Sequence, residues 1–212
     1  MADISGIFKA YDIRGAVGTE LNEAVAEGIG KALADMLDPG TVAVGRDMRP
    51  DSGALADAVI AGLTSQGRDV IDIGQVTSDM IYFAVGSMGL AGGAMVTASH
   101  NPGKDNGIKL CREQAKPIGH ESGLFAIRDA VIAGTFNPAA EKPGTVTTKN
   151  IDEGWVQHVL SFVDADKLKP MRIAVDAGNG MAGKIFPELE PYVPWEVDEM
   201  YFELDGTFPN HE

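Results

Sequence analysis

Residues 41–74 read TVAVGRDMRPDSGALADAVIAGLTSQGRDVIDIG, a pattern from which the fold class follows. Residues 41–45 form a short apolar run typical of a buried strand, and residues 69–74 form a second one. Between them, apolar residues recur at the spacing of one helix face, which predicts a helix over 52–66 that ends at a glycine. A strand, a helix and a strand in this order form a unit of a parallel sheet, so we predict an α/β fold.

The same alternation continues on both sides of this unit. Helices are predicted at 22–37, 78–88, 123–132 and 152–163, and strands at 92–97 and 107–111. Asn22 is a good N-cap for the first of these helices. Residues 138–148 contain Pro, Gly and Thr without apolar periodicity, so we expect them to form a connection.

A second domain begins near residue 172. Residues 172–183 read RIAVDAGNGMAG, an apolar strand that runs directly into a glycine-rich turn. About 40 residues follow the start of that strand, and a single βαβ unit of this size cannot bury both faces of a parallel sheet. We therefore expect an incomplete second domain. The glycines also fit G-x-G-x-x-G, which leaves dinucleotide binding as an alternative to a tight strand-to-helix turn.

The composition excludes several classes of partner. The formal charge is −14, from 17 Lys and Arg against 31 Asp and Glu, which argues against nucleic acid and anionic membranes as partners. No apolar run is long enough for a membrane span, and the first residues lack the pattern of a secretory signal. The one cysteine, Cys111, cannot form an internal disulfide, so we expect a cytoplasmic protein in which this thiol is a small buried apolar group.

Candidate chemistry is concentrated at residues 96–110, VTASHNPGKDNGIKL. An apolar strand is followed there by a polar loop, and ligands of open α/β sheets bind at the carboxyl ends of strands. The polar groups are a hydroxyl, an imidazole, two amides and two amines, from Ser99, His100, Asn101, Asn106, Lys104 and Lys109. Together they favour a site for a small anionic substrate, although a plain polar turn has a similar composition.

Three ordered motifs carry a resemblance to a known family. FKAYDIRG at 8–15, GRDMR at 45–49 and TASHNP at 97–102, followed by NGIK, resemble the α-D-phosphohexomutase superfamily. The first and third are similar to its phosphomannomutase/phosphoglucomutase branch. VDAGNGMAG at 175–183 and DGTFPNHE at 205–212 resemble the start and a later segment of that family's second domain. The resemblance implies a three-layer αβα domain with a mixed sheet at 1–150, a connecting helix at 151–170 and the start of a second, similar domain at 171–212.

The resemblance also implies an activity and a set of site residues. The enzyme would interconvert hexose 6-phosphate and hexose 1-phosphate, of mannose or glucose, through a phosphoserine and a hexose bisphosphate. The implied catalytic residues are Ser99 (the phosphoserine), His100, Lys109 and Arg14, and the implied substrate-binding residues are Tyr11, Asn101 and Asn106. A lysine acts as a base only when desolvation or a nearby cation favours its neutral form, and Arg14 is a candidate for that neighbour.

The resemblance further implies Mg²⁺, held in part by a phosphoryl oxygen on Ser99. The family's DGDxDR metal loop and its later sugar- and phosphate-binding loops are absent from this sequence, so we expect no tight metal binding and an inactive fragment whose partners include C-terminal domains of the same protein. A non-catalytic sugar-phosphate-binding module is the alternative. A serine hydrolase is disfavoured, because Ser99 lacks a G-x-S-x-G context. We expect Arg46, Asp47 and Arg49 to form an ion-pair network that braces the loop.

Overall fold

The structure is a computed structural model that describes residues 4–211. Its main sheet has the strand order β1-β5-β4-β2-β3-β7, with β6 paired to β5. The strands are β1 (Ile13–Ala16), β2 (Val42–Arg46), β3 (Val70–Gln75), β4 (Gly92–Val96), β5 (Asp105–Arg112), β6 (Lys116–Pro117) and β7 (Val146–Thr148). Strands β4, β2, β3 and β7 run parallel, whereas β5 is antiparallel to β4, β1 and β6. The sheet is therefore mixed, as expected.

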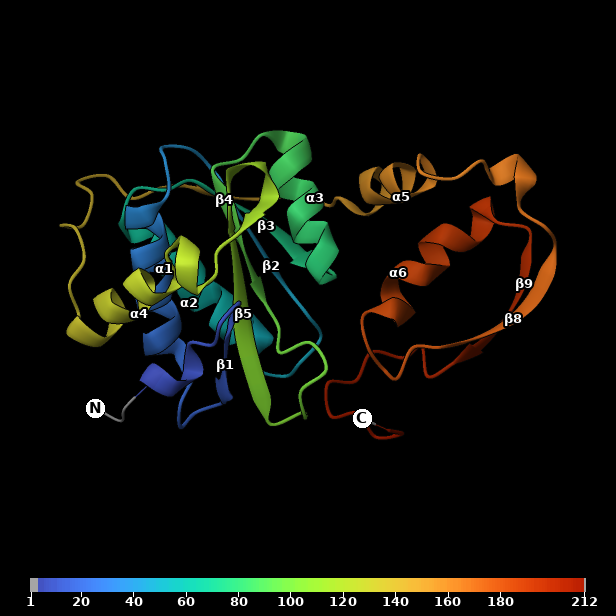
Figure 1. The fold of residues 1–212 in the computed structure, drawn as a ribbon, viewed down its shortest axis with the longest axis horizontal. Coiled ribbons are helices and arrows are strands. Elements are labelled where there is room, and N and C mark those ends of the chain that lie inside the picture. Colours follow the sequence, from blue (N-terminus) through green and yellow to red (C-terminus); the bar gives the residue numbers. More distant parts are fainter. Residues whose placement is uncertain (1–3, 212) are drawn as a thin grey trace.

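Helices cover both faces of this sheet (Figure 1). Helices α1 (Glu23–Met36), α2 (Ser52–Ser65) and α4 (Leu124–Ala133) cover one face, and α3 (Ser78–Met88) covers the other. Successive side chains of a strand point to opposite faces, so Val42 and Val44 join the first core while Ala43 joins the second. This arrangement gives the predicted three-layer αβα domain.

Helices α1 and α2 pack unusually close together, and two glycines allow it. A Cβ atom on Gly30 would overlap the carbonyl oxygen of Val59, and one on Gly62 would overlap that of Glu27. The close contact buries Ile29, Leu33 and Leu63 against the sheet. Short 3₁₀ turns complete the connections, at Ser5–Ile7, Glu113–Ala115, His120–Ser122, Ala165–Lys167 and Glu190–Tyr192.

The N-cap of α1 gives a test of how the helix begins. Asn22 has an extended backbone, and its side chain accepts a hydrogen bond from the backbone N–H of Val25, with an N···O distance of 3.1 Å. Asn22→Ala removes that acceptor and is expected to lower the free energy of unfolding by about 1 kcal/mol in urea denaturation. Asn22→Asp keeps the acceptor and serves as the control. Equal losses in the two variants would show that the cap is not the cause.

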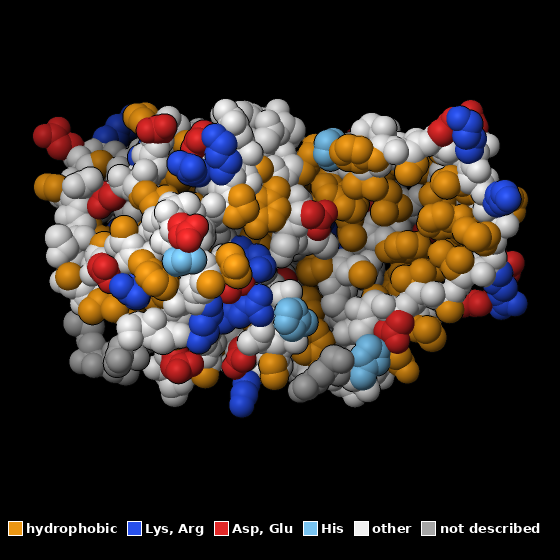
Figure 2. Space-filling model, viewed as in Figure 1, with side chains coloured by type: hydrophobic (Ala, Val, Ile, Leu, Met, Phe, Trp, Pro, Cys, Tyr) orange, Lys and Arg blue, Asp and Glu red, His pale blue; other side chains and the backbone are white. Residues whose placement is uncertain are grey.

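A smaller unit follows the main domain along the chain. It comprises α5 (Asp152–Leu160), α6 (Ala182–Leu189) and a two-stranded parallel sheet of β8 (Met171–Asp176) and β9 (Trp195–Met200). Many side chains of β8 and β9 are exposed, and Figure 2 shows apolar side chains gathered over this part of the molecule. Within residues 4–211, no helix has the length and apolar character needed to cross a membrane.

Several sequence-based boundaries need correction. Strand β1 was not predicted, because four residues with two of them glycine and alanine give no clear alternation. Strand β7 lies inside the predicted connection at 138–148, where its three exposed residues pair with β3. Helix α5 ends at Leu160 rather than at 163, and Phe162 beyond it is largely exposed. The connecting helix expected at 151–170 therefore covers only the first half of that range. Edge strands and helix ends have few buried residues, so the apolar pattern marks them poorly.

Candidate functional site

The loop after β4 presents a serine at the edge of the sheet. Thr97 and Ala98 are buried at the end of this strand, whereas Ser99 and His100 are exposed. The Ser99 Oγ lies 3.3 Å from the His100 Nδ1, within hydrogen-bond distance. Ser99 has a φ of 57°, in the left-handed region that residues other than glycine rarely adopt. The fold therefore turns the chain sharply at this residue and exposes its hydroxyl beside an imidazole.

A cleft of about 260 Å³ opens beside this serine. Its walls come from the ends of β2 and β4, the N-terminus of α3 and the turn before α6. The lining residues are Asp47, Met48, Val76, Thr77, Ser78, Met95, Thr97, Ser99, His100 and Met181. The cleft lies at the carboxyl ends of parallel strands, where open α/β sheets bind their ligands.

Two cations and a carboxylate form a cluster near this loop. Strands β1 and β5 pair so that Arg14 lies opposite Gly107. Asp12 accepts from Arg14 Nη2 at 2.8 Å and from Lys109 Nζ at 2.9 Å. Burial raises the pKa of Asp12, but the hydrogen bonds and charges of Arg14 and Lys109 lower it more, so the net pKa lies below its ordinary value. Asp12 is therefore held as a carboxylate between the two cations.

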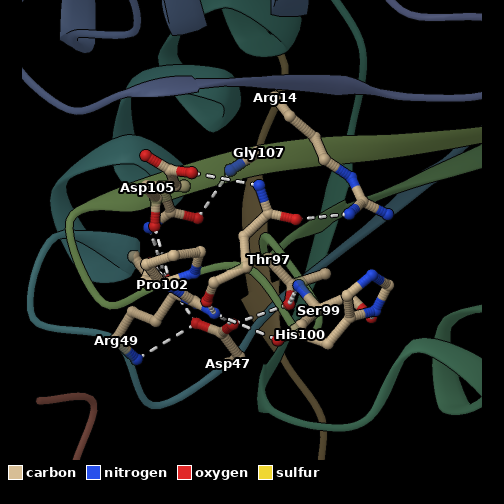
Figure 3. A network of polar contacts seen from close by, with 12 residues as sticks. Arg14, Asp47, Arg49, Thr97, Ser99, His100, Pro102, Asp105 and Gly107 are labelled. Atoms are coloured by element: carbon tan, nitrogen blue, oxygen red, sulfur yellow. Dashed lines mark hydrogen bonds and ion pairs between the residues drawn. The ribbon is translucent and has the colours of Figure 1, made fainter. Parts of the chain in front are cut away.

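Asp12 belongs to this cluster but was not predicted as a candidate site residue. Arg14 was predicted to be the cation that favours a neutral Lys109, but Asp12 contacts both side chains and offsets their repulsion. The sequence feature that could have indicated Asp12 is its place in the motif FKAYDIRG, two residues before Arg14. The cluster continues to the loop, because Arg14 Nη1 donates to Asn101 Oδ1 at 2.6 Å (Figure 3).

The residues predicted to bind substrate lie in three different settings. Tyr11 is 81% exposed, on the surface of the domain. Asn101 is half-buried, and besides accepting from Arg14 it donates to Asp105 Oδ2 at 3.0 Å. Asn106 is fully buried; it donates to Ser52 Oγ at 2.9 Å and accepts from the N–H of Gly107. A side chain so placed cannot contact a ligand in this conformation, so Asn106 supports the loop from beneath.

A buried arginine holds the loop from below (Figure 3). Arg49 pairs with Asp47 at 3.2 Å, which confirms the predicted ion pair between these residues. Its guanidinium also donates to four backbone carbonyl oxygens, those of Ser99, Asn101, Pro102 and Asp105, at 3.0, 2.6, 2.8 and 2.8 Å. Arg46 is not part of this network, because its nearest carboxylate is Asp72 at 3.7 Å.

A metal site and the thiol of Cys111 are the remaining candidates for chemistry in the described residues. Residues 4–211 contain no cluster of three or more His, Cys, Asp or Glu side chains that could hold a metal ion. The described residues therefore do not supply a ligand set for Mg²⁺ by themselves. Burial raises the pKa of Cys111 to about 12, so this thiol is an apolar packing group, as predicted.

Comparison with known proteins assigns the family. The family model described as phosphoglucomutase/phosphomannomutase, alpha/beta/alpha domain I, matches residues 5–138, a span that includes the Ser99 loop and the Asp12 cluster. The chain belongs to the phosphoglucomutase/phosphomannomutase family. Family membership agrees with the mixed three-layer fold and with the motifs at residues 8–15 and 97–102.

Curated relatives and a solved structure support the family. The chain is 50% identical over 204 residues to a protein named "Phosphohexose mutases" from Xanthomonas campestris, and 41% identical over 209 residues to a phosphomannomutase of Salmonella typhimurium. Each alignment covers 96% of this chain but only 45% and 46% of the relative. A crystal structure of a phosphoglucomutase/phosphomannomutase family protein from Burkholderia thailandensis matches with a TM-score of 0.89 and 31% identity, covering 100% of this chain and 47% of that one. The chain thus spans under half the length of these family members.

Proposed function

We propose that this chain is the N-terminal, phosphoserine-carrying part of a phosphohexomutase that interconverts hexose 6-phosphate and hexose 1-phosphate. Ser99 carries the transferable phosphoryl group, and the intermediate is a hexose bisphosphate. The chain alone does not turn over substrate, because a whole enzyme of this family has more than twice its length. The observation that carries the proposal is the exposed Ser99 hydroxyl, held beside His100 at the carboxyl edge of the sheet.

Each transfer exchanges one phosphorus–oxygen bond for another. A sugar hydroxyl oxygen forms a bond to phosphorus as the bond from phosphorus to Ser99 Oγ breaks. The sugar hydroxyl gives up its proton and the serine oxygen takes one up. The bisphosphate then reorients, and its other phosphoryl group returns to Ser99 by the reverse exchange. We assign the proton taken up at the serine to His100, whose Nδ1 lies 3.3 Å from Oγ. The Lys109 cation, paired with Asp12, neutralises charge near the sugar hydroxyl, and the proton of that hydroxyl passes to solvent.

Positive charge near the loop supports phosphoryl chemistry. Phosphoryl transfer develops charge on the peripheral oxygens, so positioning and nearby cations do most of the work. Arg14 and Lys109 share one carboxylate, Asp12, and Arg14 connects this cluster to the loop through Asn101. Figure 2 shows Lys and Arg side chains gathered near the middle of the face that it displays. A small phosphate monoester fits this environment better than a neutral ligand.

The sugar pocket and the metal site would be completed by parts of the enzyme that lie outside this chain. The cleft of about 260 Å³ is small beside a typical small-molecule site of about 300–1,000 Å³, so further walls for the sugar would come from segments that the longer relatives possess. Mannose or glucose is the hexose, and Mg²⁺ would be held with Ser99 in the whole enzyme. We divide the chain into a first domain at 1–150, a connecting segment at 151–170 that contains α5, and the start of a second domain at 171–212. The free, buried Cys111 agrees with a cytoplasmic location.

Intact mass spectrometry tests this function. Incubation of the purified 212-residue chain with glucose 1,6-bisphosphate is expected to add about 80 Da, the mass of one phosphoryl group. Peptide mapping should place the phosphoryl group on Ser99. Hexose phosphate interconversion by the same sample should stay at background.

Two serine variants make this test specific. Ser99→Ala should remove the mass gain, whereas Ser87→Ala, which changes an exposed serine at the far end of α3, should leave it intact. A phosphoryl group on another residue, or no gain in wild type, would contradict the assignment of Ser99. Measurable mutase turnover by this chain would contradict the proposed dependence on further domains.

A further inference from the structure

The backbone of Ser99 requires a restraint that the candidate chemistry does not explain. Its φ of 57° lies in the left-handed region, which is unfavourable for a residue with a Cβ atom. Such a conformation persists where surrounding contacts over-determine it. Its side chain is exposed, so packing around the Ser99 side chain does not provide that restraint. The restraint must come from the backbone contacts of the loop.

Thr97 supplies a direct restraint. The backbone N–H of Ser99 donates to Thr97 Oγ1 at 2.9 Å, and this hydroxyl in turn donates to Asp47 Oδ2 at 2.6 Å (Figure 3). Thr97 and Asp47 are both buried, with exposed fractions of 5% each, so water does not compete strongly for these bonds. The hydrogen bond fixes the amide of Ser99 three residues after the end of β4.

Asp47 determines which way the Thr97 hydroxyl points. A carboxylate can only accept hydrogen bonds, so the Thr97 proton must point to Asp47, and the lone pairs of its oxygen are left to accept the Ser99 N–H. The other carboxylate oxygen of Asp47 accepts from Ser52 Oγ at 2.5 Å and from the N–H of Arg49 at 3.0 Å. Asn106 donates to that serine hydroxyl. The buried groups therefore form a chain of hydrogen bonds in which each donor and acceptor role is fixed.

We propose that Thr97, with its hydroxyl oriented by Asp47, is a positioning residue that holds Ser99 in the left-handed conformation needed for phosphoryl transfer. The inference rests on the proposed function of Ser99 and deepens it. Thr97 itself touches no reacting atom. Its contribution is to fix the direction in which the Ser99 Oγ leaves the backbone. Without this hydrogen bond the loop relaxes, and the hydroxyl spends less time beside His100.

A matched pair of variants tests the effect on phosphoryl transfer. Thr97→Val keeps the shape of the side chain but has no hydroxyl, whereas Thr97→Ser keeps the hydroxyl. With glucose 1,6-bisphosphate as the donor, Thr97→Val is expected to slow the labelling of Ser99 by about tenfold to a hundredfold, a range typical of misplaced reacting groups. Thr97→Ser should restore most of the wild-type rate. Labelling of folded Thr97→Val at the wild-type rate would overturn the proposal.

A second measurement does not depend on phosphoryl transfer. Glycine adopts the left-handed region readily, so Ser99→Gly relieves the strain that the Thr97 hydrogen bond offsets. In urea denaturation, Thr97→Val should therefore cost less stability in the Ser99→Gly background than in wild type. Equal costs in the two backgrounds would overturn the link between the residues. If wild type is never phosphorylated, the proposed function fails, while this cycle still decides whether Thr97 restrains Ser99.

Discussion

Replacement of Arg49 by alanine is expected to lower the free energy of unfolding by about 3–5 kcal/mol, because it leaves a buried carboxylate without its charged partner. Arg49 is 3% exposed, and its guanidinium contacts Asp47 and four carbonyl oxygens of the loop at 99–105. Each of those oxygens would lose a charged donor inside the protein. No other side chain in the described region is seen to tie so much of the loop to the sheet.

The same change should also disorder the site. The loop carries Ser99, so its labelling by a hexose bisphosphate is expected to fall with the loss of Arg49. Arg49→Lys keeps the charge but cannot present a planar fork to several carbonyls, and it should recover only part of the stability. The ring of Phe208 lies 5.1 Å from the Arg49 guanidinium, so removing the arginine should also loosen the chain near residue 208.

An exposed arginine provides the control for this prediction. Arg172 makes two hydrogen bonds of 3.0 Å to Asp198, but its side chain is 67% exposed. Exposed pairs contribute at most about 1 kcal/mol, so Arg172→Ala should change urea denaturation far less than Arg49→Ala. Similar losses in the two variants would mean that burial of the Arg49 pair is not what stabilises the loop.

The order of strands and helices could be predicted because it depends on local periodicity. The apolar pattern of residues 41–74 predicts the ends of β2, α2 and β3 to within one or two residues, and Asn22 predicts the start of α1. The antiparallel direction of β5 could not be obtained in this way. Apolar spacing records which residues are buried but not which strand lies beside them, so the mixed character of the sheet came from the family resemblance alone.

In the candidate site, too, residues adjacent in sequence could be predicted, whereas contacts between residues far apart in sequence could not. Ser99, His100 and Asn101 are adjacent in sequence, so their motif could be recognised as one loop. The contacts of Asp12 with Lys109 and of Asp47 with Thr97 join residues 97 and 50 positions apart. Such pairs exist only once β1 lies against β5 and β2 against β4. The same dependence explains why Asn106, polar and within the motif, is buried under the loop instead of lining the site.

Replacement of Asp12 by asparagine should give a loss of stability that depends on pH. Asp12 is 6% exposed and accepts charged hydrogen bonds from Arg14 and Lys109, so Asp12→Asn is expected to cost about 1.5–3 kcal/mol at pH 7. The pKa of this carboxyl lies below its ordinary value in the folded protein. Its stabilising contribution is therefore complete above about pH 4, the ordinary value, and is lost as the pH falls through the lower folded value.

Urea denaturation of wild type and Asp12→Asn at a series of pH values measures this effect. The difference in unfolding free energy between the two proteins should be constant from pH 5 to 7 and should shrink below about pH 4, because protonation makes wild-type Asp12 neutral as well. Asp198→Asn, which removes an exposed carboxylate from the pair with Arg172, should show a much smaller difference. A difference that widens on acidification, or is absent at pH 7, would contradict the assignment of Asp12 as the carboxylate that holds Arg14 and Lys109 together.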